Sequence, residues 1–167
     1  MRKITIVGAG RVGETTAQIL AEEELCREIA LYDVREDVPE GVALDICQTA
    51  PFFEFDCALS GSNDPQIMRG SEMLVITAGL PRKPGMSRSD VLEANVRVID
   101  EVVDQAKRYA PDAMILMVTN PVDTLTYRAF RRSGWPRERV FGQAGVLDAS
   151  RMASFMAPSM ALEACRQ

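Results

Sequence analysis

The stretch "KITIVGAGRVGE" at residues 3–14 decides the fold, because it joins a predicted strand to a predicted helix through three glycines. These glycines have the spacing G-x-G-x-x-G. Gly8 permits a tight turn, Gly10 lets the backbone approach a pyrophosphate, and Gly13 lets the helix pack closely on the strand. The first N–H groups of the helix then face the anion. The pattern predicts a dinucleotide-binding turn.

The next predicted strand, "EIALYD" at residues 28–33, ends in Asp33, which lies 20 residues beyond Gly13. A carboxylate at this position accepts hydrogen bonds from both hydroxyls of an adenosine ribose and repels a 2′-phosphate. The combination therefore favours NAD over NADP. The alternative is that the glycines only form a turn and that Asp33 only caps the strand.

The remaining chain continues the alternation of strand and helix. Continuous apolar runs at residues 72–78 and 113–119 are typical of buried parallel strands. Segments with helical period predict helices at residues 12–24, 39–49, 87–110 and 122–132, and Ser87 with Asp90 resembles a capping box. The fold class predicted is α/β, a doubly wound parallel sheet of the Rossmann type.

Composition limits the classes of function. The 167 residues, 47% of them hydrophobic, suit one ordinary globular domain. A net charge of −5 argues against a nucleic-acid partner, and no apolar run approaches the length of a membrane span, so we expect a small-molecule ligand and a cytoplasmic protein. The chain has no histidine and no C-x-x-C pair, so we expect no metal site and no Cys-His nucleophile.

A cationic loop, "LPRKPGMSR" at residues 80–88, follows the strand at 72–78. Its arginines can clamp carboxylates, and its prolines and glycines, counting Gly79 at the start of the loop, suggest a closing lid, although a solvated surface loop is the alternative. "VTNPVD" places Asn120 at the same sheet edge. In "GVLDASR", Asp148 and Arg151 lie on one helix face, where they could contribute to a site. The alternative is that they form only a surface ion pair.

These residues together resemble a known family, the NAD-dependent malate dehydrogenases of the lactate/malate dehydrogenase superfamily, particularly the prokaryotic type that is similar to lactate dehydrogenases. The matching pieces occur in family order: "IVGAGRVGETTAQ", "LYDV", "EGVALDICQTAP", "GSND", "VITAGLPRKPGMSR", "VTNPVD" and "SGWPRERVFGQAGVLDASR". The resemblance implies an NAD-binding domain at residues 1–145. Residues 146–167 would then be the first helix of a truncated substrate domain, with an atypical tail and most of that domain missing.

The resemblance also implies which residues bind the cofactor: Gly8, Ala9, Gly10, Arg11, Val12, Gly13, Asp33, Asn95, Val118, Thr119 and Asn120. For the substrate, it implies that Arg82 pairs with the distal carboxylate, where lactate enzymes usually carry glutamine. Arginine there favours malate or oxaloacetate. Arg88 would polarise the reacting carbonyl, Asn120 would hydrogen-bond the substrate oxygen, and Arg151 would clamp the α-carboxylate. Asp148 would orient a catalytic histidine.

The activity implied is reversible hydride transfer between (S)-malate or oxaloacetate and NAD(H), in the tricarboxylic acid cycle. The family's histidine lies in a "GGHGD"-like motif, which this chain lacks. The alternatives are therefore a catalytically inactive NAD-binding module and a relative of lactate dehydrogenase.

Family members work as dimers or tetramers, so a homo-oligomer is expected. Apolar residues of the last helix, Met152, Phe155 and Met156, with Met160 and Leu162, would form an exposed patch without the second domain.

Overall fold

The computed structural model describes residues 1–81 and 84–159 and contains a sheet of six parallel strands in the order β3-β2-β1-β4-β5-β6. The strands are β1 (Lys3–Val7), β2 (Glu28–Tyr32), β3 (Ala58–Ser62), β4 (Met73–Ile76), β5 (Met114–Met117) and β6 (Val140–Gly142). The chain adds β2 and β3 on one side of β1, and then adds β4, β5 and β6 on the other side. The strand order therefore reverses between β1 and β4. The predicted doubly wound fold is confirmed.

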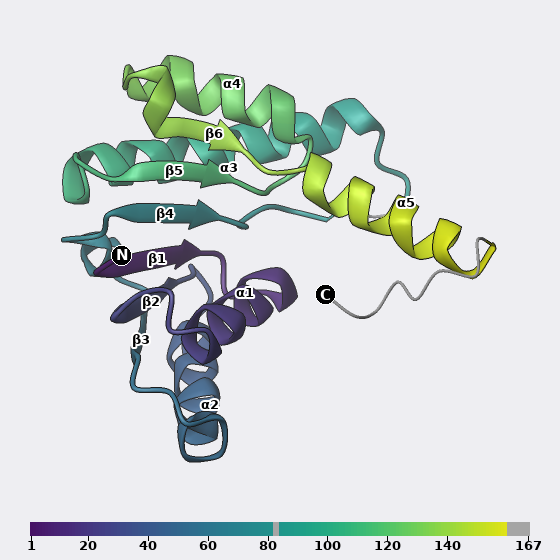
Figure 1. Cartoon of the computed structure of the whole chain (residues 1–167). Helices are drawn as coiled ribbons and strands as arrows, with labels where there is room; N and C mark the ends of the chain where they lie inside the picture. The colour runs from purple at the N-terminus through teal and green to yellow at the C-terminus, as the bar shows by residue number, and fades with distance from the viewer. Residues whose placement is uncertain (82–83, 160–167) are drawn as a thin grey trace.

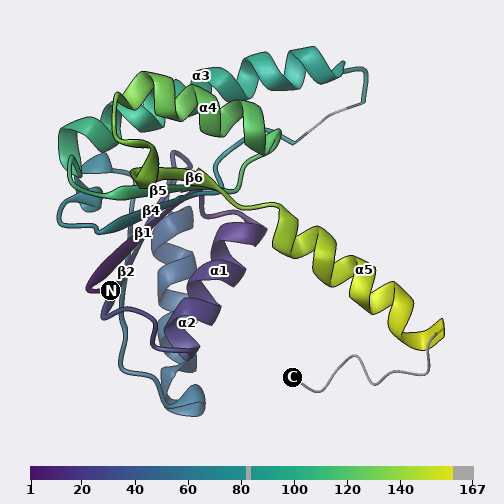
Figure 2. The same cartoon turned by 45° about the horizontal axis from the view of Figure 1, so that its top comes forward.

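Helices cover both faces of the sheet (Figure 1). On one face lie α1 (Arg11–Glu22) and α2 (Val38–Phe53), and on the other lie α3 (Arg88–Tyr109) and α4 (Val122–Ser133). Two short 3-10 helices, η1 (Pro65–Met68) and η2 (Arg137–Arg139), complete the connections. Helix α5 (Gly145–Ser159) follows β6 and extends away from the sheet in both views (Figures 1 and 2).

The sheet divides the hydrophobic core into two layers, because successive side chains of a strand point to opposite faces. On β4, Leu74 and Ile76 join the layer under α3 and α4, whereas Val75 joins the layer under α1 and α2. Both layers are closed to water, since Leu74 and Ile76 are fully buried and Val75 is 4% exposed. Strand β4 is therefore apolar on both sides, which explains the continuous apolar run at this point of the sequence.

Two edge strands were not predicted. Among the described residues, β3 pairs with β2 alone and β6 pairs with β5 alone, so each has one strand neighbour. The sequence of β3, "ALSGS", has no β-branched run, and a Cβ on Gly61 would lie 2.0 Å from the Pro39 carbonyl oxygen. A small residue is needed there because α2 begins against the strand, and a glycine weakens the strand pattern in the sequence.

The capping signal in the sequence correctly predicts the beginning of α3, whereas a proline does not end α2. The Ser87 hydroxyl accepts from the Asp90 N–H at 3.1 Å, and the Asp90 carboxylate accepts from the Ser87 N–H at 2.8 Å, which confirms the capping box of α3. Helix α2 continues to Phe53 although the prediction ended it at residue 49, before Pro51. The Glu54 N–H still donates to the Ala50 carbonyl at 2.8 Å, so the helix bonds resume after the proline.

Helices α3 and α4 are joined by arginine–aspartate pairs. The Asp100 carboxylate accepts two hydrogen bonds from Arg128, at 2.7 Å from Nε and 2.6 Å from Nη2. Arg132 adds a third contact to the same carboxylate at 3.3 Å and also pairs with Asp104. The hydrogen bonds from Arg128 lower the pKa of Asp100 and outweigh the opposing effect of burial.

This pair predicts an acid-dependent part of the stability. Because the pKa of Asp100 is lowered on folding, its contribution is complete above the pKa of an unfolded aspartate, about 3.9, and is lost as the pH falls through the folded pKa. We therefore expect Asp100→Asn to lower the urea midpoint at pH 7. The variant should also lose less stability than the wild type between pH 5 and pH 3.

The matched control is Asp45→Asn on α2. Asp45 is exposed and forms no ion pair or hydrogen bond through its side chain with the described residues. Its substitution should leave the pH dependence of the midpoint unchanged. If Asp100→Asn has the same pH profile as the wild type, the ion pair does not contribute as inferred.

Candidate functional site

The turn between β1 and α1 is shaped by close backbone contacts. Gly8 has a φ of +107°, and a Cβ on Gly13 would lie 1.9 Å from the Gly8 carbonyl oxygen. The Thr77 hydroxyl, from the end of β4, donates to the same oxygen at 2.9 Å. A Cβ on Gly10, in contrast, would meet nothing within 4 Å. Two glycines are therefore required by packing, while the third faces open space where a ligand can approach.

The open space lies at the beginning of α1. Gly10 is the N-cap residue and provides no side-chain cap, so the first N–H groups of the helix keep their donors for another acceptor. Buried Ala9 precedes it, and the exposed Arg11 and Val12 follow. Helix N-termini of this kind attract phosphate through their N–H groups and their dipole. The arrangement fits the pyrophosphate of a dinucleotide, as the glycine spacing predicts.

Asp33 lies beside this turn, directly after β2. Its Oδ2 accepts from the Ala9 N–H at 2.8 Å, and its carboxylate also forms an ion pair with Arg35. Burial alone would raise the pKa of Asp33, but the hydrogen bonds from Arg35 and Ala9 outweigh it and lower the pKa. A charged carboxylate is thus fixed next to the glycine turn, where the predicted ribose contact requires it.

The other end of the sheet edge is organised by Asn95 of α3, which is only 2% exposed. Its Oδ1 accepts from the Leu80 N–H at 2.7 Å, and its Nδ2 donates to the Asn120 carbonyl at 3.1 Å. The Thr119 hydroxyl donates to the Ala78 carbonyl at 2.7 Å. Asn95 thereby ties the segment after β4 to the segment after β5.

The strand order places these groups in one row. Asp33 follows β2, the glycine turn follows β1, Ala78 follows β4, and residues 118–120 follow β5, and these four strands are consecutive neighbours. The row crosses the point between β1 and β4 where the strand order reverses, which is where open α/β sheets bind ligands. The predicted cofactor residues are therefore brought together along one edge.

The predicted substrate residues are more dispersed. Arg88 is the first residue of α3 and is exposed, while Asp148 and Arg151 lie on α5. The Arg151 guanidinium contacts the Asp148 carboxylate at 3.3 Å, with both side chains well exposed. Across the described residues, neither of them forms a hydrogen bond or an ion pair with Arg88. Arg82 lies outside the described residues, so its placement stays a prediction.

Sequence reasoning missed two residues of the edge, Thr77 and Arg35. Thr77 lies in the apolar run that predicts β4, and its hydroxyl contacts become visible only when β4 is placed beside β1. Arg35 follows Asp33 by two residues, and this proximity of opposite charges was a signal that could have found it. Gly79 was noted only as part of the loop, yet its Cβ would lie 2.5 Å from the Thr119 side chain.

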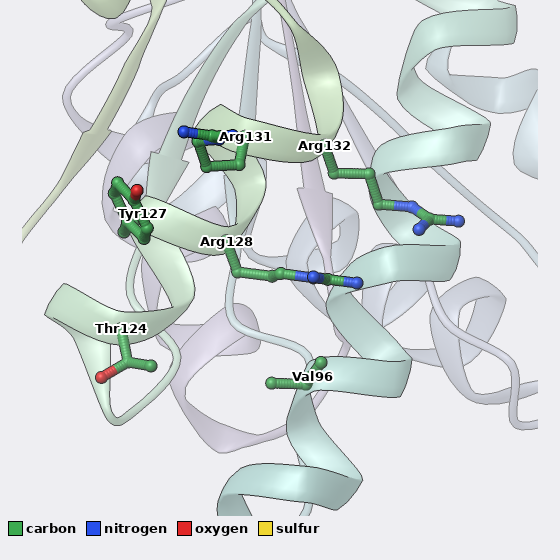
Figure 3. Close-up of a pocket in the computed structure, with 6 residues that line it drawn as sticks. All are labelled: Val96, Thr124, Tyr127, Arg128, Arg131 and Arg132. Atoms are coloured by element: carbon green, nitrogen blue, oxygen red, sulfur yellow. The ribbon is translucent and has the colours of Figure 1, made fainter.

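A groove of about 620 Å³ lies elsewhere, between α3 and α4 (Figure 3). It is lined by Val96, Thr124, Tyr127, Arg128, Arg131 and Arg132. Figure 3 shows Arg128 and Arg132 reaching from α4 toward α3, where both guanidinium groups are paired with aspartates. The groove lies on the helical face rather than at the strand ends, so it is not the dinucleotide site.

The match to a family model agrees with this geometry. Residues 2–142 match the model described as lactate/malate dehydrogenase, NAD binding domain. The chain belongs to the lactate/malate dehydrogenase family. The NAD-binding domain therefore extends over the glycine turn, Asp33, Asn95 and residues 118–120, and the cofactor is NAD.

Individual relatives point the same way. A malate dehydrogenase from Thioalkalivibrio sulfidiphilus is 65% identical over 157 residues, which are 94% of this chain and 51% of that protein. A malate dehydrogenase from Nitrosococcus oceani is 58% identical, with coverage of 94% and 50%. The chain thus spans about half the length of the curated relatives it matches.

The solved structures that are similar to this chain include a malate dehydrogenase and a lactate dehydrogenase. The apo malate dehydrogenase from Picrophilus torridus has a TM-score of 0.93 and 38% identity, covering 98% of this chain and 52% of that one. A lactate dehydrogenase from Cryptosporidium parvum, solved with lactic acid and nicotinamide adenine dinucleotide, has a TM-score of 0.91 and 36% identity, with coverage of 98% and 51%. The fold is therefore shared by a malate dehydrogenase and a lactate dehydrogenase.

The described residues contain neither a membrane-spanning helix nor a group of candidate metal ligands. Among residues 1–81 and 84–159, no helix combines the length and apolarity needed to cross a membrane. Over the same ranges, no three side chains of histidine, cysteine, aspartate or glutamate are grouped as metal ligands.

The glycine turn predicts two opposite mutational effects. Gly10→Val should leave the melting temperature nearly unchanged, because its Cβ meets open space and its φ of −87° suits any residue. Gly13→Ala should instead destabilise the fold by about 1–3 kcal/mol, because its Cβ collides with the Gly8 carbonyl. Differential scanning calorimetry measures both effects.

NADH titration separates the two roles. Gly10→Val should lose binding while staying folded, because its side chain occupies the approach of the pyrophosphate. Binding of NADH by Gly10→Val with the affinity of the wild type would contradict the placement of the pyrophosphate at this turn.

Proposed function

We propose that the chain supplies the NAD(H)-binding half of a malate dehydrogenase, an oxidoreductase that transfers hydride reversibly between (S)-malate or oxaloacetate and NAD(H). The observation that carries this proposal is the row of groups along one sheet edge, from Asp33 through the glycine turn to Asn95 and Asn120. A relative that is 65% identical and is named malate dehydrogenase supports the choice of reaction.

The residues of the row have separate roles in holding the cofactor. Asp33 accepts from the adenosine ribose, and the N-terminus of α1 holds the pyrophosphate. At the other end, Asn95 fixes the segments after β4 and β5, so that residues 118–120 border the nicotinamide. NAD supplies the hydride chemistry when it is bound, and the protein supplies orientation.

Substrate contacts are assigned to the arginines in this proposal. Arg82 pairs with the distal carboxylate, Arg151 clamps the α-carboxylate, and Arg88 polarises the reacting carbonyl, while Asn120 hydrogen-bonds the substrate oxygen. Asp148 stabilises the positive charge of a proton-transferring imidazole. No histidine occurs in the chain, so that group has to come from outside these residues.

The position of α5 supports a division into two domains, with the NAD-binding domain at residues 1–145 and the beginning of a substrate domain at residues 146–167. Helix α5 extends away from the sheet (Figure 2), and Phe155 on it is 83% exposed. An apolar side chain in this position needs a covering surface. The remainder of a substrate domain and a second subunit, in a dimer or tetramer, are the coverings that we propose.

Two alternatives rest on separate observations. Without histidine, the 167 residues act as an NAD-binding module that does not turn over substrate. The similarity to lactate dehydrogenase structures supports a lactate-type specificity, against which Arg82 argues by its charge.

A role in the tricarboxylic acid cycle and a cytoplasmic location complete the proposal. The free thiols of Cys26, Cys47 and Cys57 are consistent with a reducing compartment.

A direct test uses the 167-residue chain itself. Fluorescence titration should detect saturable NADH binding, because the described cofactor groups all lie within the chain. Malate-dependent reduction of NAD should be absent, because no imidazole is present for proton transfer. Reduction by a pure preparation would refute the module alternative, and failure to bind NADH would refute the proposed function.

Specificity is tested in a hybrid of residues 1–157 with the C-terminal half of the Thioalkalivibrio sulfidiphilus relative. The hybrid should prefer oxaloacetate to pyruvate. Arg82→Gln should lower kcat/KM for oxaloacetate by about 10- to 100-fold, the effect of losing one hydrogen-bonded charge pair, while pyruvate reduction is spared. A hybrid that prefers pyruvate would overturn the role given to Arg82.

A further inference from the structure

The carboxylate of Asp33 is fully occupied by donors from the protein. Oδ2 accepts from the Ala9 N–H at 2.8 Å and from Arg35 Nη2 at 2.9 Å. Oδ1 accepts from the Arg35 N–H at 3.0 Å and from Arg35 Nε at 3.0 Å. An ionised carboxylate offers about four acceptor positions. All of them are filled, so no position is left for the hydroxyls of a ribose.

The four donors divide into two fixed and two removable ones. The two backbone donors are held by the fold, because Ala9 belongs to the glycine turn and the backbone at Arg35 is fixed by the side chain of Asn63. Asn63 Nδ2 donates to the Asp33 carbonyl at 2.7 Å and to the Arg35 carbonyl at 2.6 Å. The two guanidinium donors belong to a side chain that is 55% exposed and can rotate into water.

The removable donors match the cofactor in number and placement. Arg35 gives one donor to each oxygen of Asp33, through Nε and Nη2. The 2′- and 3′-hydroxyls of an adenosine ribose are also two donors side by side. The guanidinium therefore takes the two acceptor positions that the ribose diol needs. Arg35 and the diol cannot bind the Asp33 carboxylate at the same time.

We propose that Arg35 is a displaceable occupant of the ribose position on Asp33 and that its displacement sets how tightly the chain holds NAD(H). This inference rests on the proposed binding of NAD(H). The ion pair keeps the buried carboxylate compensated before the cofactor arrives, since an unpaired charge in this position is costly. Cofactor binding exchanges that pair for the ribose hydroxyls, which weakens the net affinity.

The test compares NADH binding by the wild-type chain and by Arg35→Ala. The variant keeps the backbone donor to Oδ1 and both bonds from Asn63, because these involve main-chain atoms of residue 35. We expect Arg35→Ala to bind NADH about 3- to 10-fold more tightly, since a partly exposed bidentate pair no longer competes. Equal or weaker binding by the variant would overturn the inference.

The matched control is Arg97→Ala on α3. Arg97 pairs with Glu93 at 2.8 Å, and both side chains are exposed, so it is an arginine in an ion pair away from Asp33. Its removal should leave the NADH dissociation constant unchanged. If Arg97→Ala tightens binding as much as Arg35→Ala, general charge explains the gain and the inference fails.

A second measurement follows the side chain directly. In a nitrogen-15 NMR spectrum, the Nε–H signal of Arg35, assigned by its loss in Arg35→Ala, should be that of a hydrogen-bonded group in the free chain. Saturation with NADH should move it to the position of a solvated guanidinium. A signal that stays unchanged in the NADH complex would overturn the inference while leaving the proposed function intact. Absence of NADH binding in both proteins would overturn both.

Discussion

The close approach of α1 to the end of β1 is the constraint on which the site depends. A Cβ on Gly13 would lie 1.9 Å from the Gly8 carbonyl oxygen, so this crossing exists only with glycine at position 13. The approach aims the beginning of α1 at the carboxyl edge of the sheet. It also brings the Ala9 N–H to 2.8 Å from the Asp33 carboxylate, so the proposed pyrophosphate site and the proposed ribose contact are positioned by one turn.

The second organising group is Asn95, which acts at the opposite end of the same edge. A buried amide that bonds both the segment after β4 and the segment after β5 fixes two loops with one side chain. Because a buried polar group is costly without partners, the contacts hold the loops and the amide together. Hydrogen bonds within the protein therefore hold the edge at both ends, whereas Arg88, Asp148 and Arg151 are exposed.

The glycine turn and Asp33, which lie side by side at one end of the edge, differ in what they already hold. At the glycine turn, the helix N–H groups have no side-chain cap and face open space. At Asp33, the acceptor positions are filled by Ala9 and Arg35, so in our proposal cofactor binding there is an exchange of partners rather than an addition. Affinity at such an edge is the difference between the new contacts and those given up, which makes it sensitive to a residue that does not touch the bound cofactor.

The sequence by itself determined the features that depend on neighbours along the chain. The glycine spacing, the apolar runs of the central strands and the Ser87–Asp90 pair are local patterns. They predicted the β1–α1 turn, the central strands and the capping box of α3, and the structure contains all three. The tertiary structure decided the rest. The edge strands β3 and β6 form by pairing with β2 and β5, and helix α5 leaves the sheet. The full occupancy of Asp33 also required it. Arg35 is a neighbour of Asp33 in sequence, but the Ala9 donor lies 24 residues away and is counted only once the fold brings it into contact.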